Sequence, residues 1–140
     1  TFEIGEHTFT REEIIRFAEQ FDPQPFHISD EGAAASPYGT LIASGWHTCS
    51  VMMGLLVRNA FAGSTSMGSP GIDDIRWLKP VRAGDTIRML NTVLERRVSA
   101  SKPDRGIVST QWEGINQHGE TVITVRSKGL FGLRNPGNAA

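Results

Sequence analysis

The chain has 140 residues, of which 39% are hydrophobic and 21% charged, and its formal net charge is -1. This length predicts a single domain over residues 1–140 that folds without disulfides or a structural metal. The one cysteine, Cys49, excludes an internal disulfide and suits a reducing compartment. A net charge near zero lacks the footprint of a general nucleic-acid-binding protein. No apolar run reaches the ~20 residues of a membrane helix and the start has no secretory pattern, so we expect a cytoplasmic protein.

The first part of the chain is predicted to be helical. Thr10 followed by Glu13 forms a capping-box pattern, and apolar residues then recur at helical spacing as far as Phe21. Two prolines follow directly, so the segment from Asp22 to His27 is predicted to be stiff and irregular. A short second helix is expected over residues 29–35.

The middle of the chain is predicted to be a buried helix over residues 44–58, because its apolar side chains surround the whole circumference. The simplest interpretation is that most of these side chains belong to the hydrophobic core and have no other role. The sequence then changes in character to strands. These are expected over residues 72–79, 86–98, 107–116 and 121–133, with a tight turn between the last two. Helices first and adjacent strands afterwards predict an α+β fold with an antiparallel sheet wrapped around the buried helix.

One candidate for chemistry is the pair of Asp22 and His27. The carboxylate and the imidazole lie five positions apart in a segment whose prolines restrict the backbone. Such a pair can share a water molecule, since one group removes a proton while the pair delivers another. Asp and Pro are also ordinary turn residues, so a purely structural Asp22 and a surface His27 remain the alternative.

A second candidate is Gly45, at the start of the buried helix. The first turn of a helix has unpaired N–H groups and the positive end of the helix dipole, which can polarise a carbonyl oxygen as an oxyanion site does. Glycine has no side chain to block that approach. It is equally suited to close packing or to a turn, and this alternative stays open. His47 could line such a pocket or simply pack in the protein.

These two segments together resemble one family. Residues 17–27 followed by residues 36–46 are similar to the MaoC-like dehydratases, which include the (R)-specific enoyl-CoA hydratases with the motif Asp-x-Asn-Pro-x-His. The similarity extends to residues 77–85 and 116–120. Gln24 stands where the motif has Asn, Phe26 where it has a smaller aliphatic residue, and Ser44 where many relatives have His.

The resemblance implies a hot-dog fold, an antiparallel sheet wrapped around a long central helix, which is usually dimeric. It further implies a hydro-lyase of fatty acid metabolism that hydrates trans-2-enoyl thioesters or dehydrates 3-hydroxyacyl thioesters, with acyl-CoA or an acyl-carrier thioester as substrate. Asp22 and His27 would then hold the water and the Gly45 N–H would bind the thioester carbonyl. We expect substrate contacts from Phe26, Ser44 and Trp46, and neither a metal nor a cofactor.

Basic residues after the second strand are candidates for binding the phosphates of coenzyme A. Arg97, Lys102 and Arg105 carry this expectation, against the alternative of an ordinary solvated face. The exposed edge of a small curled sheet also predicts at least a homodimer.

Two other functions stay open. One is a hot-dog thioesterase, although such enzymes usually carry a carboxylate on the central helix and residues 46–57 have none. The other is a non-catalytic acyl-thioester binding subunit.

Overall fold

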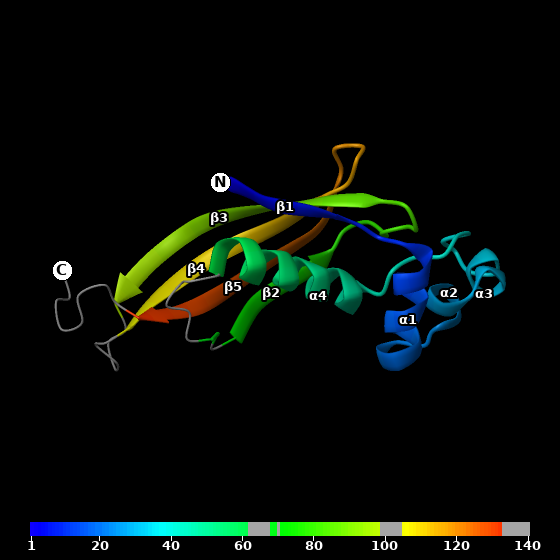
Figure 1. Ribbon diagram of the computed structural model, residues 1–140, viewed down its shortest axis with the longest axis horizontal. Helices are drawn as coiled ribbons and strands as arrows, with labels where there is room; N and C mark the ends of the chain where they lie inside the picture. The colour runs from blue at the N-terminus through cyan, green and yellow to red at the C-terminus, as the bar shows by residue number, and fades with distance from the viewer. Residues whose placement is uncertain (62–67, 70, 99–104, 133–140) are drawn as a thin grey trace.

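The computed structural model describes residues 1–61, 68–69, 71–98 and 105–132. Its strands form one antiparallel five-stranded sheet in the order β1-β3-β4-β5-β2. The sheet curves around the long helix α4, while α1, α2 and α3 gather at one end (Figure 1). The strands are β1 Phe2–Thr8, β2 Gly71–Trp77, β3 Thr86–Val98, β4 Arg105–Ile115 and β5 Thr121–Gly132. The helices are α1 Arg11–Phe21, α2 Pro25–Ile28, α3 Asp30–Ala34 and α4 Gly45–Leu56, followed by a π-helical turn over Val57–Phe61.

The predicted α+β architecture is confirmed, including the last four strands and the turn that joins β4 to β5. In that turn the Asn116 side-chain oxygen accepts hydrogen bonds from the backbone N–H groups of His118 and Glu120. Gly119 takes the left-handed backbone conformation, with φ of 79°, that favours glycine. The predicted fourth strand ran to Leu133, which lies outside the described residues.

Strand β1 was not predicted. It pairs with β3 along its length and buries only Ile4. Its register shifts between Glu3 and Gly5, which interrupts the simple alternation of inward and outward side chains. A strand held mainly by backbone pairing at a sheet edge leaves little hydrophobic signal in the sequence.

Helix α1 begins as the capping box predicts. The Glu13 N–H donates to the Thr10 hydroxyl, and the Glu13 carboxylate accepts from the Thr10 N–H at 2.7 Å. The helix ends at Phe21, but the expectation of an irregular segment as far as His27 was wrong. Pro25 opens the short helix α2, where the N–H that proline lacks would have had no helical partner.

Helix α4 begins at Gly45 with Ser44 as its N-cap, as predicted. Met52, Leu55 and Leu56 form the face of α4 that belongs to the core it shares with the sheet. The expectation that this helix is buried on all sides was wrong for the single chain. One stripe stays exposed, at 57% for Trp46, 40% for Met53 and 45% for Val57, because a single sheet covers a single side. None of the helices in the described ranges is long and apolar enough to cross a membrane.

Candidate active site

A cavity of about 520 Å³ lies where the ends of α1 and β2 meet α2 and the first turn of α4. It is lined by Asp22, His27 and Gly45, the three residues predicted to carry the chemistry. Phe26 and Trp46, two of the expected substrate contacts, also line it. The structure therefore brings together groups that lie more than twenty positions apart in the sequence.

Asp22 occupies the C-cap position of α1 and is held by two side chains. Its Oδ2 atom accepts a hydrogen bond from the Ser44 hydroxyl at 2.7 Å, and its Oδ1 atom accepts one from the Gln24 amide at 2.7 Å. Burial acts to raise the pKa of Asp22, but the hydrogen bonds from Gln24 and Ser44 and the charge of His27 outweigh it and lower the pKa overall. Asp22 is therefore ionised at neutral pH.

His27 lies on α2 and is almost fully buried, with 4% of its surface exposed. Its Nδ1 atom lies 2.7 Å from the carbonyl oxygen of Ile42. Because a carbonyl can only accept, Nδ1 carries a proton, and in this tautomer of the imidazole the Nε2 atom presents a lone pair. Nε2 lies 3.4 Å from Asp22 Oδ2. Two acceptors at this separation can both be served by one donor such as a water molecule.

Gly45 provides the amide expected at the start of α4. The neighbouring N–H groups are occupied: Trp46 donates to the Ser44 hydroxyl, and His47 donates to the Ser44 carbonyl. Among the described residues no partner is found for the Gly45 N–H, as the first position of a helix implies. Ser44, which we expected to contact substrate, is fully buried and instead links this helix start to Asp22.

Gly45 is also a site of close packing. A Cβ atom at this position would lie 2.4 Å from the indole nitrogen of Trp77, so the indole rests directly on the glycine. Trp77 in turn meets Trp46 edge to face, with ring centroids 5.3 Å apart. Both interpretations of the glycine thus apply: its missing side chain makes room for Trp77, and it stands at the head of the helix.

Sequence reasoning missed several residues of the cavity wall. Trp77 and Tyr38 come from distant segments, and Tyr38 packs against Phe26 with ring centroids 5.2 Å apart. Only long-range folding brings them here, so no local pattern could have found them. Thr48 could have been found, since it lies one helical turn after Ser44 on the same face of α4.

Arg97 and Arg105, two of the basic residues expected to bind coenzyme A phosphates, do not line this cavity. Arg97 is the last residue but one of β3 and pairs with Ile107 near the start of β4, at the end of the sheet far from α1 (Figure 1). At about 3.4 Å per residue, that end lies roughly 25 Å along the strands from the cavity. Arg105 begins β4 at the same far end, and Lys102 lies outside the described residues. The sequence places these charges close together along the chain but could not indicate that Arg97 and Arg105 lie at the end of the sheet away from the cavity.

Other reactive side chains near the start of α4 have structural surroundings. His47 is 5% exposed and stacks on Phe17 with ring centroids 4.9 Å apart. Burial raises the pKa of the Cys49 thiol, and the hydrogen bond from the Trp77 indole only partly offsets this rise. The thiol is therefore protonated at neutral pH. In the part of the chain that the structure describes, no three His, Cys, Asp or Glu side chains are grouped to hold a metal ion.

Comparisons with known proteins agree with this fold. The family model of the MaoC like domain matches residues 3–113. The chain belongs to the MaoC-like dehydratase family. The crystal structure of a MaoC-like dehydratase from Rhodospirillum rubrum superposes with a TM-score of 0.86 at 39% identity, covering 96% of this chain and 91% of that one. This MaoC-like chain therefore has the hot-dog fold that the sequence resemblance implied.

Several curated relatives carry names that describe an activity, including two dehydratases. A 3-hydroxybutyryl-CoA dehydratase of Methylorubrum extorquens is 25% identical over 131 residues, which span 90% of this chain and 79% of that protein. A 3-hydroxyacyl-thioester dehydratase Z of Mycobacterium tuberculosis is 30% identical over 89 residues, which span 62% of this chain and 59% of that protein. At the level of the family, the MaoC-like chain is thus related to hydro-lyases.

The lowered pKa of Asp22 makes stability depend on pH in a defined direction. Because the folded pKa lies below the ordinary 3.8, the bonds to ionised Asp22 stabilise the protein above that pH and are lost as the pH falls through the folded pKa. Gln24→Ala removes one of these bonds and should raise the pKa of Asp22, measured by NMR titration of its carboxyl carbon. The loss of unfolding free energy relative to wild type should shrink toward acid pH.

Gln20→Ala provides the matched control for this substitution, because Gln20 is exposed on α1 and contributes no hydrogen bond to Asp22. It should leave the titration of Asp22 unchanged. An unaltered Asp22 pKa in Gln24→Ala would show that the Gln24 amide does not hold the carboxylate in solution.

Proposed function

We propose that this protein hydrates trans-2-enoyl thioesters, or catalyses the reverse dehydration of 3-hydroxyacyl thioesters, with acyl-CoA as the substrate. The observation that carries the proposal is the shared cavity in which Asp22 and His27 face the start of α4. Membership of the MaoC-like family and the names of the dehydratase relatives support the reaction class. The aromatic walls from Phe26, Trp46 and Trp77 suit an acyl chain.

The first step in the proposed mechanism is polarisation of the substrate. The thioester carbonyl oxygen accepts a hydrogen bond from the Gly45 N–H at the positive end of the α4 dipole. Electron density moves toward that oxygen, so the β-carbon becomes electrophilic. The same contact strengthens as negative charge develops on the enolate, and it therefore lowers the barrier rather than only tightening binding.

The second step is the addition of water. A water molecule donates to Asp22 and to the Nε2 lone pair of His27, whose Nδ1–H is held by the Ile42 carbonyl. As the water oxygen bonds to the β-carbon, one water proton passes to Nε2, and the Asp22–His27 pair then returns a proton to the α-carbon. The hydroxyl and hydrogen of one water are thus added across the double bond, with no change in oxidation state overall.

A thioesterase reaction is the alternative outcome of an assay. It would release a free thiol and a carboxylate, and it calls for a carboxylate on the central helix in most enzymes of this fold. Helix α4 carries none between Gly45 and Leu56. Tight acyl-CoA binding without turnover would instead indicate a non-catalytic binding subunit.

Substitutions at the paired residues test the proposed chemistry. Asp22→Asn and His27→Ala should each lower the rate of enoyl-CoA hydration by at least about a hundred-fold, the contribution expected of general acid–base groups. The rate is followed by loss of absorbance of the conjugated double bond. Glu19→Gln, at an exposed position of α1, should retain the wild-type rate. Near-native rates in either folded variant would reject the assignment.

A homodimer is part of the proposal, because the single chain leaves apolar surface uncovered beside the cavity. The exposed stripe of α4 continues into strand β2, where Ile72 is 52% exposed and Trp77 47% exposed. Strand β2 lies at one edge of the sheet, where no strand of the described residues pairs with its outer side and another strand could be added. A second copy related by a two-fold axis would cover the stripe and pair the edges.

Light scattering at micromolar concentration should give the mass of a dimer or a larger assembly. Met53→Glu places a charge in the exposed stripe and should reduce the mass toward that of one chain, while Glu19→Lys on α1 should not. A monomeric wild type would contradict the proposed assembly.

A further inference from the structure

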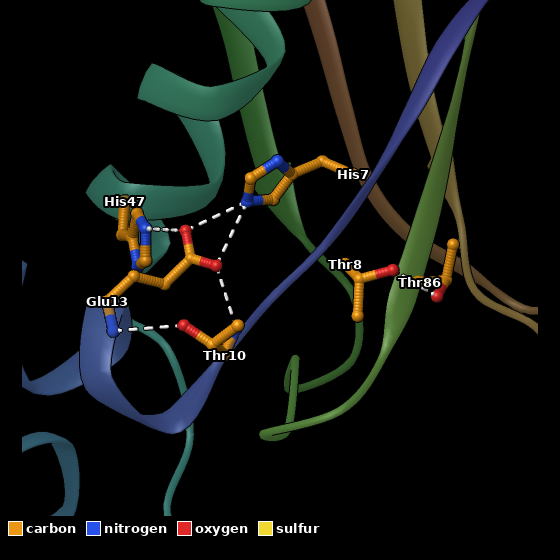
Figure 2. Close-up of polar contacts among 6 residues, drawn as sticks. All are labelled: His7, Thr8, Thr10, Glu13, His47 and Thr86. Carbon is orange, nitrogen blue, oxygen red and sulfur yellow. Dashed lines mark hydrogen bonds and ion pairs between the residues drawn. The ribbon is translucent and has the colours of Figure 1, made fainter.

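Helix α1 holds the first turn of α4 at two points, one on each side of Gly45. At its end, Asp22 accepts a hydrogen bond from Ser44, the residue before Gly45. In its first turn, the Oε2 atom of Glu13 lies 3.3 Å from Nε2 of His47, two residues after Gly45 (Figure 2). Two carboxylates at the two ends of α1 therefore contact side chains on either side of the amide that the proposed mechanism uses.

Glu13 is itself fixed by other contacts. Its Oε2 atom lies 2.8 Å from Nε2 of His7 on β1, and its Oε1 atom accepts from the Thr10 N–H at 2.7 Å. Figure 2 shows the carboxylate between the two histidines, with Thr10 below it. Burial acts to raise the pKa of Glu13, but these hydrogen bonds and the charges of the histidines lower it overall, so the carboxylate is ionised at neutral pH. The Glu13 carboxylate, which contacts His47 on α4, is thus also held by His7 on β1 and by the N-cap residue of α1.

The His47 ring is tightly enclosed. It stacks on Phe17 with an interplanar angle of 11° and meets Phe9 edge to face at 5.0 Å between centroids. The titratable groups that act on it are Glu13 from α1 and His7 from β1. Burial lowers the pKa of His47 and outweighs the opposing effect of the Glu13 charge, so the ring is neutral at pH 7. The Nε2–H bond of this neutral ring points toward Glu13.

Stability alone does not account for a histidine at this position. The Nδ1 atom of His47 is buried and has no hydrogen-bond partner among the described residues. An unpaired buried acceptor costs free energy that an apolar side chain of similar size would avoid. What the imidazole provides, and an apolar residue cannot, is a directed contact with Glu13.

We propose that Glu13 is a positioning residue, which acts through His47 to fix the direction of the Gly45 N–H toward the Asp22–His27 pair. The inference rests on the proposed function, since the thioester carbonyl is the group that this amide would bind. A hydrogen bond weakens steeply when its angle departs from linearity, and an oxyanion donor must be aimed at the oxygen before the reaction begins. Holding both flanks of Gly45 prevents its peptide plane from rotating.

The test compares Glu13→Gln with Thr10→Ala. Glutamine at Glu13 keeps the acceptor that a capping box needs, but its amide nitrogen cannot accept the His47 Nε2–H. Thr10→Ala removes the hydroxyl cap of the same helix and leaves the contact between Glu13 and His47 in place. Both substitutions should lower the melting temperature by about 3 °C. The two variants should therefore differ in the orientation of the Gly45 N–H and not in stability.

The first measurement is steady-state hydration of enoyl-CoA well below the melting temperature. Glu13→Gln should lower kcat roughly ten-fold with KM changed less than about two-fold, because the lost alignment acts on the developing enolate. Thr10→Ala should keep kcat within about two-fold of wild type. Equal kcat losses in the two variants, or a Glu13→Gln effect confined to KM, would overturn the positioning role.

The second measurement separates this inference from the proposed function. The one-bond residual dipolar coupling of the Gly45 N–H, recorded by NMR on the full chain without substrate, reports the direction of that bond. It should change in Glu13→Gln and stay unchanged in Thr10→Ala. A wild type that hydrates no enoyl thioester defeats the proposed function, whereas an unchanged Gly45 coupling in Glu13→Gln defeats the positioning by Glu13.

Discussion

The hydrogen bond between the Asp22 carboxylate and the Ser44 hydroxyl joins the end of α1 to the start of α4 at 2.7 Å. One contact here serves two needs. It holds Asp22 ionised near His27, and it fixes the residue that caps α4 immediately before Gly45. Ser44 is fully buried, while Asp22 keeps 18% of its side chain exposed toward the cavity. The proposed catalytic arrangement therefore depends on two helix termini meeting at one point.

The rest of the fold keeps those termini in place. The sheet curves around α4 and buries one face of it, which fixes the axis of the helix. Strand β1 leads directly into α1, and its His7 contributes to the contacts around Glu13. Pro23 between α1 and α2, and Pro25 at the start of α2, limit the conformations of the chain that carries His27 to its place beside Asp22. Packing thus keeps the helices in place, and short polar contacts orient the groups of the proposed site.

The sequence predicted the parts of this protein whose signals are local. The capping box gave the start of α1, the apolar run gave α4, and alternation gave four strands within two residues of their observed limits. Strand β1 escaped because edge pairing uses backbone groups that every residue has. The cavity wall formed by Trp77 and Tyr38 escaped for a different reason, since only the closed fold brings these side chains to Gly45 and Phe26.

The burial of α4 was predicted only in part. Its sequence is apolar on every side, yet the single chain covers only the sides that face the sheet and α1 and leaves the stripe with Trp46, Met53 and Val57 exposed. The basic residues Arg97 and Arg105 show the same limit, because their position depends on the direction of the strands rather than on local pattern. The residue types indicated the chemical properties of these side chains, whereas the topology of the sheet determines their positions in the structure.

The most direct test of the account is the fate of solvent oxygen. When the enzyme acts on a trans-2-enoyl-CoA in water enriched in heavy oxygen, mass spectrometry should find the label in a hydroxyl group on the β-carbon, with the thioester intact. Label in a free carboxylate with release of the thiol, or no incorporation at all, would contradict the addition of water by Asp22 and His27.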